Sequence, residues 1–286
     1  MLVIVGAVVV VASVLGGYAA MGGHLAVLAQ PFELVIIAGA AFGAFVIANP
    51  RIVLVRAGKG IVRILKGPRY DKQSYVELLS LLYQIFKLAK TKGMLALESH
   101  VENPAESSLF QQFPSVTENA AAMTFLCDYL RMLTLGTENP HEVEALIDEE
   151  LETRHAEHNQ VSSAIQTVAD GLPALGIVAA VLGVIKTMGA ITEPPEVLGR
   201  LIGGALVGTF LGVFLAYGFV GPIAHAIRAL DNAEMKYLQC IRAGLLAHMQ
   251  GYPPAVSVEF ARKALLELDR PTFYEVEEAV QALPPV

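Results

Sequence analysis

The chain has little of the charge that soluble enzymes and nucleic-acid-binding proteins carry. Only 16% of its 286 residues are charged and 54% are hydrophobic, with a mean hydropathy of +0.53, which is more apolar sequence than one soluble core requires. The formal net charge of −7 argues against nucleic acid as a partner and against anionic lipid as the main one. Cysteine is scarce too: Cys127 and Cys240 lie too far apart for a metal motif, so we expect reduced structural thiols.

Local signatures of catalysis are also missing. No set of Ser, His and Asp has a recognisable spacing, and the glycine pairs at 16–17 and 22–23 lack the strand–turn–helix context of a phosphate-binding loop. His155 and His158 could share a helix face as metal ligands, but no third ligand has a convincing spacing. We therefore expect a protein that is not an enzyme and that binds no cofactor and no metal.

Long apolar segments dominate instead, at residues 2–18, 32–48, 172–186 and 198–220. A helix needs about 20 residues to cross a bilayer. No basic residue precedes the first segment and a second follows closely, so we interpret the first as a retained helix and not a cleaved signal peptide. The pattern predicts an all-α polytopic protein of the lipid bilayer, with four transmembrane helices and a helical cytoplasmic domain.

The basic residues predict the orientation. Twelve of the twenty lie between Arg51 and Arg154 and six lie from Arg228 onward, whereas the loop at 19–31 has none. The positive-inside rule therefore places both termini in the cytoplasm. The resulting division is 1–50 for the first two spans, 51–166 for a cytoplasmic loop, 167–227 for the last two spans and 228–286 for a cytoplasmic tail.

Hydrophobic spacing predicts helices in the cytoplasmic segments. Apolar residues recur every three to four positions from Tyr75 to Ala89, before Gly93 stops the helix. The same pattern covers 120–135, and Pro140 starts a helix that runs toward the third span. In the tail we predict two short helices, at 255–268 and 272–283.

Small residues form a stripe on each of the last two spans: Gly176, Ala179, Ala180 and Gly183 on the third, and Gly204, Gly208 and Gly212 on the fourth. Such stripes let helices approach closely. In one interpretation the stripes border a narrow lumen or another protein's helix, and in the other they only let the helices of one bundle pack tightly. Thr209 is the one hydroxyl on the fourth span's stripe. Because we expect the spans to lack a titratable relay of their own, a transported cation would need an acid borrowed from a partner.

Two prolines and two charges are further candidates. Pro173 and Pro222 lie at the predicted inner ends of the last two spans, where a proline permits a kink. One interpretation of these prolines is a gate on the inner side of the bilayer, and the other is the ordinary use of proline at a helix end. Lys90 and Glu98 lie on either side of the break at Gly93, and most such surface charges are merely solvated.

Seven segments in collinear order, over nearly the whole chain, resemble the MotA family of bacterial flagellar motor stator proteins: GGYAAMGG, QPFELVIIAGAAFGAF, LLYQIFKLAKTKGMLALESHVENPAES, EALIDEELETRH, DGLPALGIVAAVLGVI, LVGTFLGVFLAYGFVGPIA and AVSVEFARKAL with RPTFYEVEE. The resemblance implies an inner-membrane protein whose copies form a ring, in the family a pentamer, around a MotB dimer. It also implies that MotB supplies the aspartate that binds and releases the ion, and the anchor to peptidoglycan.

The resemblance assigns roles to single positions. Thr209 matches a threonine that faces the ion pathway, and Ala180 and Tyr217 match positions that line the partner helices and the pathway. Pro173 and Pro222 match a pair associated with conformational change during ion passage.

Lys90 and Glu98 match the charged pair that engages the rotor protein FliG. The family often has arginine at the position of Lys90, so the charge is kept but bidentate geometry is lost. Sodium-driven relatives carry additional threonines near the pathway, whereas Ala180 and Gly208 supply no side-chain oxygen, so we favour protons over sodium as the transported ion.

These observations predict a stator subunit that, with MotB, couples proton flow to torque on the flagellar rotor. The nearest alternative is a proton-driven energiser of the ExbB or TolQ type, but those relatives usually have three spans and four are predicted here. A membrane scaffold without ion flux is the other alternative, in which the glycine stripes serve only packing.

Overall fold

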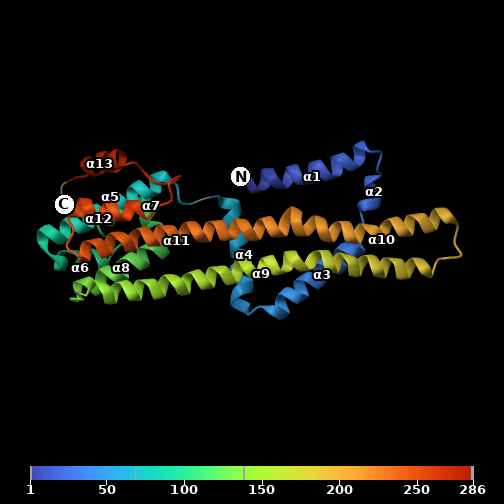
Figure 1. Cartoon of the computed structure of the whole chain (residues 1–286), viewed down its shortest axis with the longest axis horizontal. Helices are drawn as coiled ribbons and strands as arrows, with labels where there is room; N and C mark the ends of the chain where they lie inside the picture. Colours follow the sequence, from blue (N-terminus) through green and yellow to red (C-terminus); the bar gives the residue numbers. More distant parts are fainter. Residues whose placement is uncertain (1, 68, 138, 285–286) are drawn as a thin grey trace. The chain divides into compact units, whose positions relative to one another are not determined.

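The computed structural model describes residues 2–67, 69–137 and 139–284, and these residues form helices and loops without a strand (Figure 1). They divide into two compact units. Unit 1 comprises Met1–Gly67 and Glu157–Leu230, and unit 2 comprises Pro68–Ala156 and Asp231–Val286. The predicted all-α class is confirmed.

Unit 1 holds the apolar helices. They are α1 (Leu2–Ala20), α2 (Leu25–Leu28), α3 (Pro31–Ala48), α4 (Arg51–Lys66), the later part of α9 (Pro140–Met188), α10 (Pro195–Leu215), the π-helical turn η3 (Ala216–Val220) and the start of α11 (Gly221–Met249). Four helical stretches are long and apolar enough to cross a membrane, Leu2–Ala20, Leu25–Ala48, Pro140–Met188 and Pro195–Met249. The predicted number of spans is therefore confirmed.

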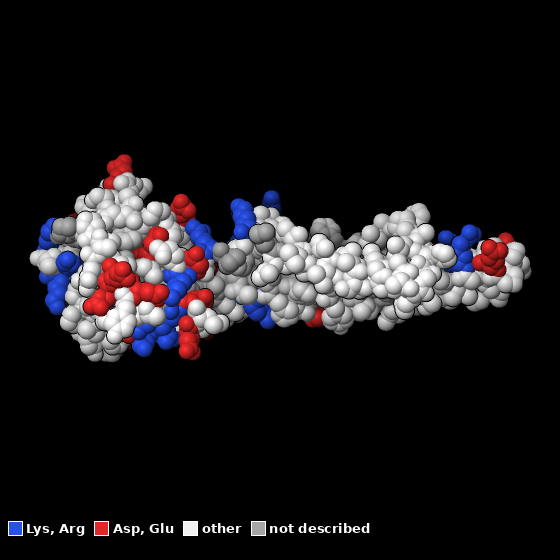
Figure 2. Space-filling model, turned by 90° about the horizontal axis from the view of Figure 1, so that it is seen from above, with Lys and Arg blue, Asp and Glu red and all other residues white. Residues whose placement is uncertain are grey.

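These helices expose apolar side chains that only lipid or protein can cover. α1 has no buried residue, and Val35 and Phe42 of α3 are each more than two-thirds exposed. A helix that is hydrophobic all round is not stable against water, but in a bilayer its backbone is satisfied internally and its side chains are solvated by acyl chains. On the face drawn in Figure 2, charged side chains are dense over unit 2 and sparse over the apolar helices.

The amphipathic helix α4, which the sequence-based division placed at the start of the cytoplasmic loop, packs within unit 1. Ala57 and Ile64 of α4 are buried in a cluster with Ile227 of α11. A Cβ on Gly60 would lie 3.1 Å from the Ile227 side chain, so glycine lets the two helices meet. α4 therefore belongs to unit 1, directly after the second span.

Unit 2 is built from short helices around one core. They are α5 (Lys72–Lys92), the 3-10 turn η1 (Met94–Leu97), α6 (Glu98–Glu102), the 3-10 turn η2 (Phe110–Gln112), α7 (Pro114–Thr117), α8 (Ala120–Thr134), the early part of α9, the later part of α11, α12 (Pro254–Lys263) and α13 (Phe273–Gln281). Each helix predicted from hydrophobic spacing has a counterpart, but the one predicted at 255–268 ends at Lys263.

Local sequence explains where α5 begins and ends. Asp71 and Ser74 form a capping box, in which each side chain accepts a hydrogen bond from the other residue's backbone N–H. Gly93 ends the helix with φ of +85°, a left-handed conformation that favours glycine. Between these ends, α5 buries a continuous apolar face that includes Phe86, and each fully buried large side chain contributes about 1.5 to 3 kcal/mol.

Both cysteines are buried and free of disulfides. Burial raises the pKa of the Cys127 thiol to about 11 and raises the pKa of the Cys240 thiol as well. A thiol with so little thiolate at neutral pH is an inert core residue, in line with the structural role predicted for the pair.

Candidate functional site

The glycine stripes of α9 and α10 pack against each other in unit 1. A Cβ on Gly176 would lie 2.7 Å from the carbonyl oxygen of Gly208, and one on Gly212 would lie 2.6 Å from the carbonyl oxygen of Leu172. Both distances are shorter than any real Cβ contact, so only glycine permits this backbone approach. Within this chain, the stripes thus meet at a helix–helix seam, and we call it the α9–α10 seam.

The seam continues toward the start of α3. A Cβ on Gly183 would lie 2.7 Å from the Ala205 Cβ, and one on Gly204 would lie 3.1 Å from Nε2 of Gln30. Gln30 is the residue before α3, and its amide donates to the Val27 carbonyl. The first turn of α3 therefore covers this end of the α9–α10 seam.

Glu33, in that first turn, is a residue that sequence reasoning missed. Its Oε2 atom would lie 2.6 Å from a Cβ on Gly208, and its Oε1 atom 3.6 Å from a Cβ on Gly183. Oε2 is buried beside the Gly208 backbone, and no hydrogen bond of regular geometry reaches it from the described residues. Glu33 is a titratable group at the start of the second span, where we expected no titratable relay. The signal was present, because Glu33 is the one acidic residue in the four apolar segments.

The three predicted pathway residues are placed differently. Thr209 and Ala180 are partly buried at the α9–α10 seam, where a Cβ on Gly208 would lie 3.0 Å from the Ala180 backbone nitrogen. Tyr217 lies in η3 and is 69% exposed. The structure thus brings Ala180 together with the Gly208–Thr209 pair, but it leaves Tyr217 on the surface.

The two prolines have different consequences. Pro222 is the second residue of α11, and only Gly221 separates it from the π-helical turn Ala216–Val220. A proline has no N–H for the residue four positions earlier and its ring clashes with that carbonyl, which accounts for the widened turn. Pro173 lies inside α9, which runs without an assigned break from Pro140 to Met188. The fourth span is therefore interrupted at its proline and the third is not.

Lys90 and Glu98 are exposed residues of unit 2. Lys90 is in the last turn of α5 and Glu98 begins α6, with the left-handed Gly93 and the turn η1 between them. Within the described part of the chain, neither side chain lies at salt-bridge distance from an opposite charge. Both charges are therefore available to a partner.

His248 of α11 lies beneath this surface. Its ring stacks on Phe86 with centroids 4.6 Å apart, and its buried Nδ1 atom has no hydrogen-bond partner among the described residues. Burial, and then the positive charge of Lys90, lower the pKa of His248. The environment of His248 therefore favours its neutral imidazole over the protonated form.

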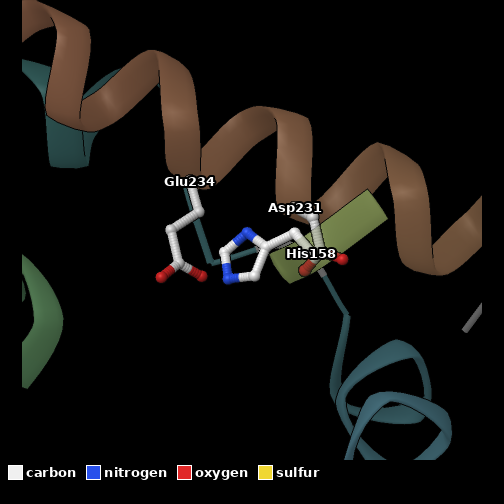
Figure 3. A group of neighbouring side chains, drawn as sticks. All are labelled: His158, Asp231 and Glu234. Carbon is white, nitrogen blue, oxygen red and sulfur yellow. The ribbon is translucent and has the colours of Figure 1, made fainter. Parts of the chain in front are cut away.

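The histidines weighed as metal ligands, His155 and His158, both lie on α9. Figure 3 shows His158 together with Asp231 and Glu234, which are three residues apart on α11 and share one face of it. His158 belongs to unit 1 and both acids to unit 2, so the three residues define no site within either unit. The absence of a metal stays a prediction.

Comparison with known proteins gives matches over almost the whole chain. The family described as Motility protein A N-terminal matches residues 4–93, and the MotA/TolQ/ExbB proton channel family matches residues 117–240. Motility protein A of Salmonella typhimurium is 43% identical over 99% of this chain and 96% of its own length. The figures for Motility protein A of Escherichia coli are 42%, 99% and 96%. Chemotaxis protein LafT of Vibrio parahaemolyticus is 36% identical over 96% of each chain.

Two solved structures have the same fold. The structure of C. jejuni MotAB superposes with a TM-score of 0.78 at 20% identity and covers 93% of this chain and 95% of its own. The flagellar MotAB stator complex from Bacillus subtilis has a TM-score of 0.72 at 23% identity, with coverage of 92% and 94%.

Proposed function

Because the chain belongs to the motility protein A family of the MotA/TolQ/ExbB proton channel proteins, we infer that it is an inner-membrane stator subunit of the bacterial flagellar motor. The observation that carries this inference is the 43% identity to a motility protein A across 99% of the chain. Such identity covers the unit 2 helices as well as the spans, so it favours a stator over an energiser that shares only the channel region.

We propose that a MotB dimer completes the ion pathway. The solved relatives are MotAB complexes, and the exposed apolar faces of α9 and α10, with Ile177, Val181 and Val213, need a cover that lipid or a partner helix supplies. The partner's aspartate would carry the ion past Thr209. The ion is a proton in this proposal, because Ala180 and Gly208 offer no side-chain oxygen to a dehydrated sodium ion.

The energy source is sufficient for mechanical work. One elementary charge that crosses 100 mV releases about 2.3 kcal/mol, so a few protons provide a useful step. We propose that the π-helical turn before Pro222 is where the fourth span yields during ion passage, because a widened turn lacks the regular hydrogen bonds that keep a helix straight. Pro173 would contribute from the third span, although α9 is unbroken in the described state.

Rotor contact and assembly are further parts of the proposal. The exposed charges of Lys90 and Glu98 would engage FliG, and copies of the chain would form a ring, a pentamer, around the MotB dimer. With the termini in the cytoplasm, as the positive-inside rule predicts, unit 2 faces the rotor.

Complementation tests this function. The chain, co-expressed with its cognate MotB in a strain without stators, should restore swimming that persists when sodium is removed at constant protonmotive force. A paralysed strain with normal membrane levels of both proteins would overturn the stator role. The same pair in strains without ExbB or TolQ tests the energiser alternative, and restoration of outer-membrane functions there would favour it.

A further inference from the structure

Glu33 occupies a helix position that usually has a simple structural use. It is the third residue of α3, where a glutamate commonly accepts a hydrogen bond from the N-cap N–H and completes a capping box. Glu275 does this in α13, where Oε2 accepts from the Thr272 backbone N–H at 2.7 Å and from the Thr272 hydroxyl at 2.9 Å. Glu33 and Glu275 therefore occupy the same position in their helices, and they differ in their hydrogen bonds.

Glu33 does not cap its own helix. The N-cap of α3 is Gln30, and no hydrogen bond of regular geometry reaches the buried Oε2 atom of Glu33 from the described residues. The carboxyl instead reaches across to the α9–α10 seam, with Oε2 at Gly208 and Oε1 toward Gly183. The absence of a side chain at Gly208 provides the space, because a Cβ there would stand 2.6 Å from Oε2.

The Gly208 position offers this carboxyl group no polar side chain as a partner. Besides Oε2 itself, the nearest atoms to a Cβ on Gly208 belong to Ala179 and Ala180 of α9, neither of which has a titratable or oxygen-bearing side chain. A buried acceptor without a donor is costly, and an acid within a membrane span is by default a functional residue. A proton would satisfy Oε2, whereas a metal cation would require further oxygen ligands that the side chains of Ala179 and Ala180 lack.

We propose that Glu33 binds and releases the transported proton at the end of the α9–α10 seam that the positive-inside rule places on the outer side of the membrane. This inference rests on the proposed proton-driven function. The step is balanced: the carboxylate takes a proton from hydronium and leaves water, and the carboxylic acid later returns the proton to water or to the partner's carboxylate.

Paired variants in the full complex test the role. Glu33→Gln keeps the shape of the side chain but cannot release a proton, and Glu33→Asp can. Glu196→Gln is the matched control, because Glu196 is also in the first turn of a span, α10, but is exposed. Each variant is co-expressed with MotB in a strain without stators, and the rotation speed of tethered cells is measured at matched membrane levels.

We expect Glu33→Gln to reduce the speed at least tenfold, Glu33→Asp to retain rotation with a displaced dependence on external pH, and Glu196→Gln to match the unmodified protein. Rotation of Glu33→Gln within twofold of the unmodified protein overturns the proposal, since a packing role survives this substitution. If Glu33→Gln does not accumulate in the membrane, an unchanged pH profile of Glu33→Asp overturns it instead. Failure of the unmodified chain to rotate cells at all would refute the proposed function, which is a separate result.

Discussion

We predict that Gly176→Ala strains the α9–α10 seam. The new methyl group would lie 2.7 Å from the Gly208 carbonyl oxygen and 3.0 Å from the Gly212 Cα, whereas ordinary contact begins near 3.4 Å. Both obstacles are backbone atoms that cannot rotate away, so the helices must separate by about 0.7 Å, a distortion of the kind that costs about 1 to 3 kcal/mol.

A control on the same helix isolates this strain. Gly171→Ala also adds a methyl group to α9, but at a position with no atom within 4 Å. Each substitution stabilises the helix by about 1 kcal/mol through helix propensity. The difference in stability between the two variants therefore reports only the strain at the seam.

Thermal unfolding of the purified complexes in detergent provides the measurement. We expect a lower midpoint for Gly176→Ala than for Gly171→Ala, and impaired swimming only with the former. Equal midpoints for the two variants would refute the reasoning that backbone approach at Gly176 holds the spans together.

Three further predictions concern unit 2 and the proline. Because the pKa of His248 is lowered in the folded state, the contribution of the neutral imidazole to stability should be complete above about pH 6.5 and should decline as the pH falls toward the folded-state pKa. Denaturant unfolding should therefore show a lower free energy of unfolding at pH 5.5 than at pH 7.5. His248→Gln should make that difference smaller. Reversal of the exposed charge in Glu98→Lys should abolish swimming with normal membrane insertion and MotB co-purification, and near-normal swimming would count against a rotor contact there. Pro222→Ala restores the missing N–H and should straighten the π-helical turn, so we expect loss of rotation with little loss of thermal stability; unchanged rotation would separate the turn from the mechanism.

The fold could be predicted from the sequence where the signal is local. A span of about 20 apolar residues or a helix stopped by Gly93 is determined by nearby residues, and these elements are present in the structure. The place of α4 could not be predicted in this way, because its basic, amphipathic pattern suits either a cytoplasmic surface or the border of the apolar helices. Only the contact of Gly60 with Ile227, far apart in the chain, decides between them.

The candidate site required tertiary information for the same reason. Glu33 is visible in the sequence as an acid at the start of a span, but its orientation toward Gly208 depends on how α3 crosses two helices that are distant in the chain. The glycine stripes likewise left open whether they border a lumen or each other, since both arrangements need the same small residues. The π-helical turn follows from Pro222, yet the same residue type at Pro173 leaves α9 unbroken, so proline alone does not predict an interruption.

Close packing of the glycines changes where a partner's acid can act. Because Gly176, Gly208 and Gly212 are buried at the α9–α10 seam, a MotB helix cannot lie against them without separating α9 from α10. A partner helix would therefore approach the edges of the seam, where Thr209 and Ala180 are partly buried and still accessible. Proton transfer would then take place beside the seam, with a carboxyl group of this chain on one side of the helix pair and the borrowed acid on another.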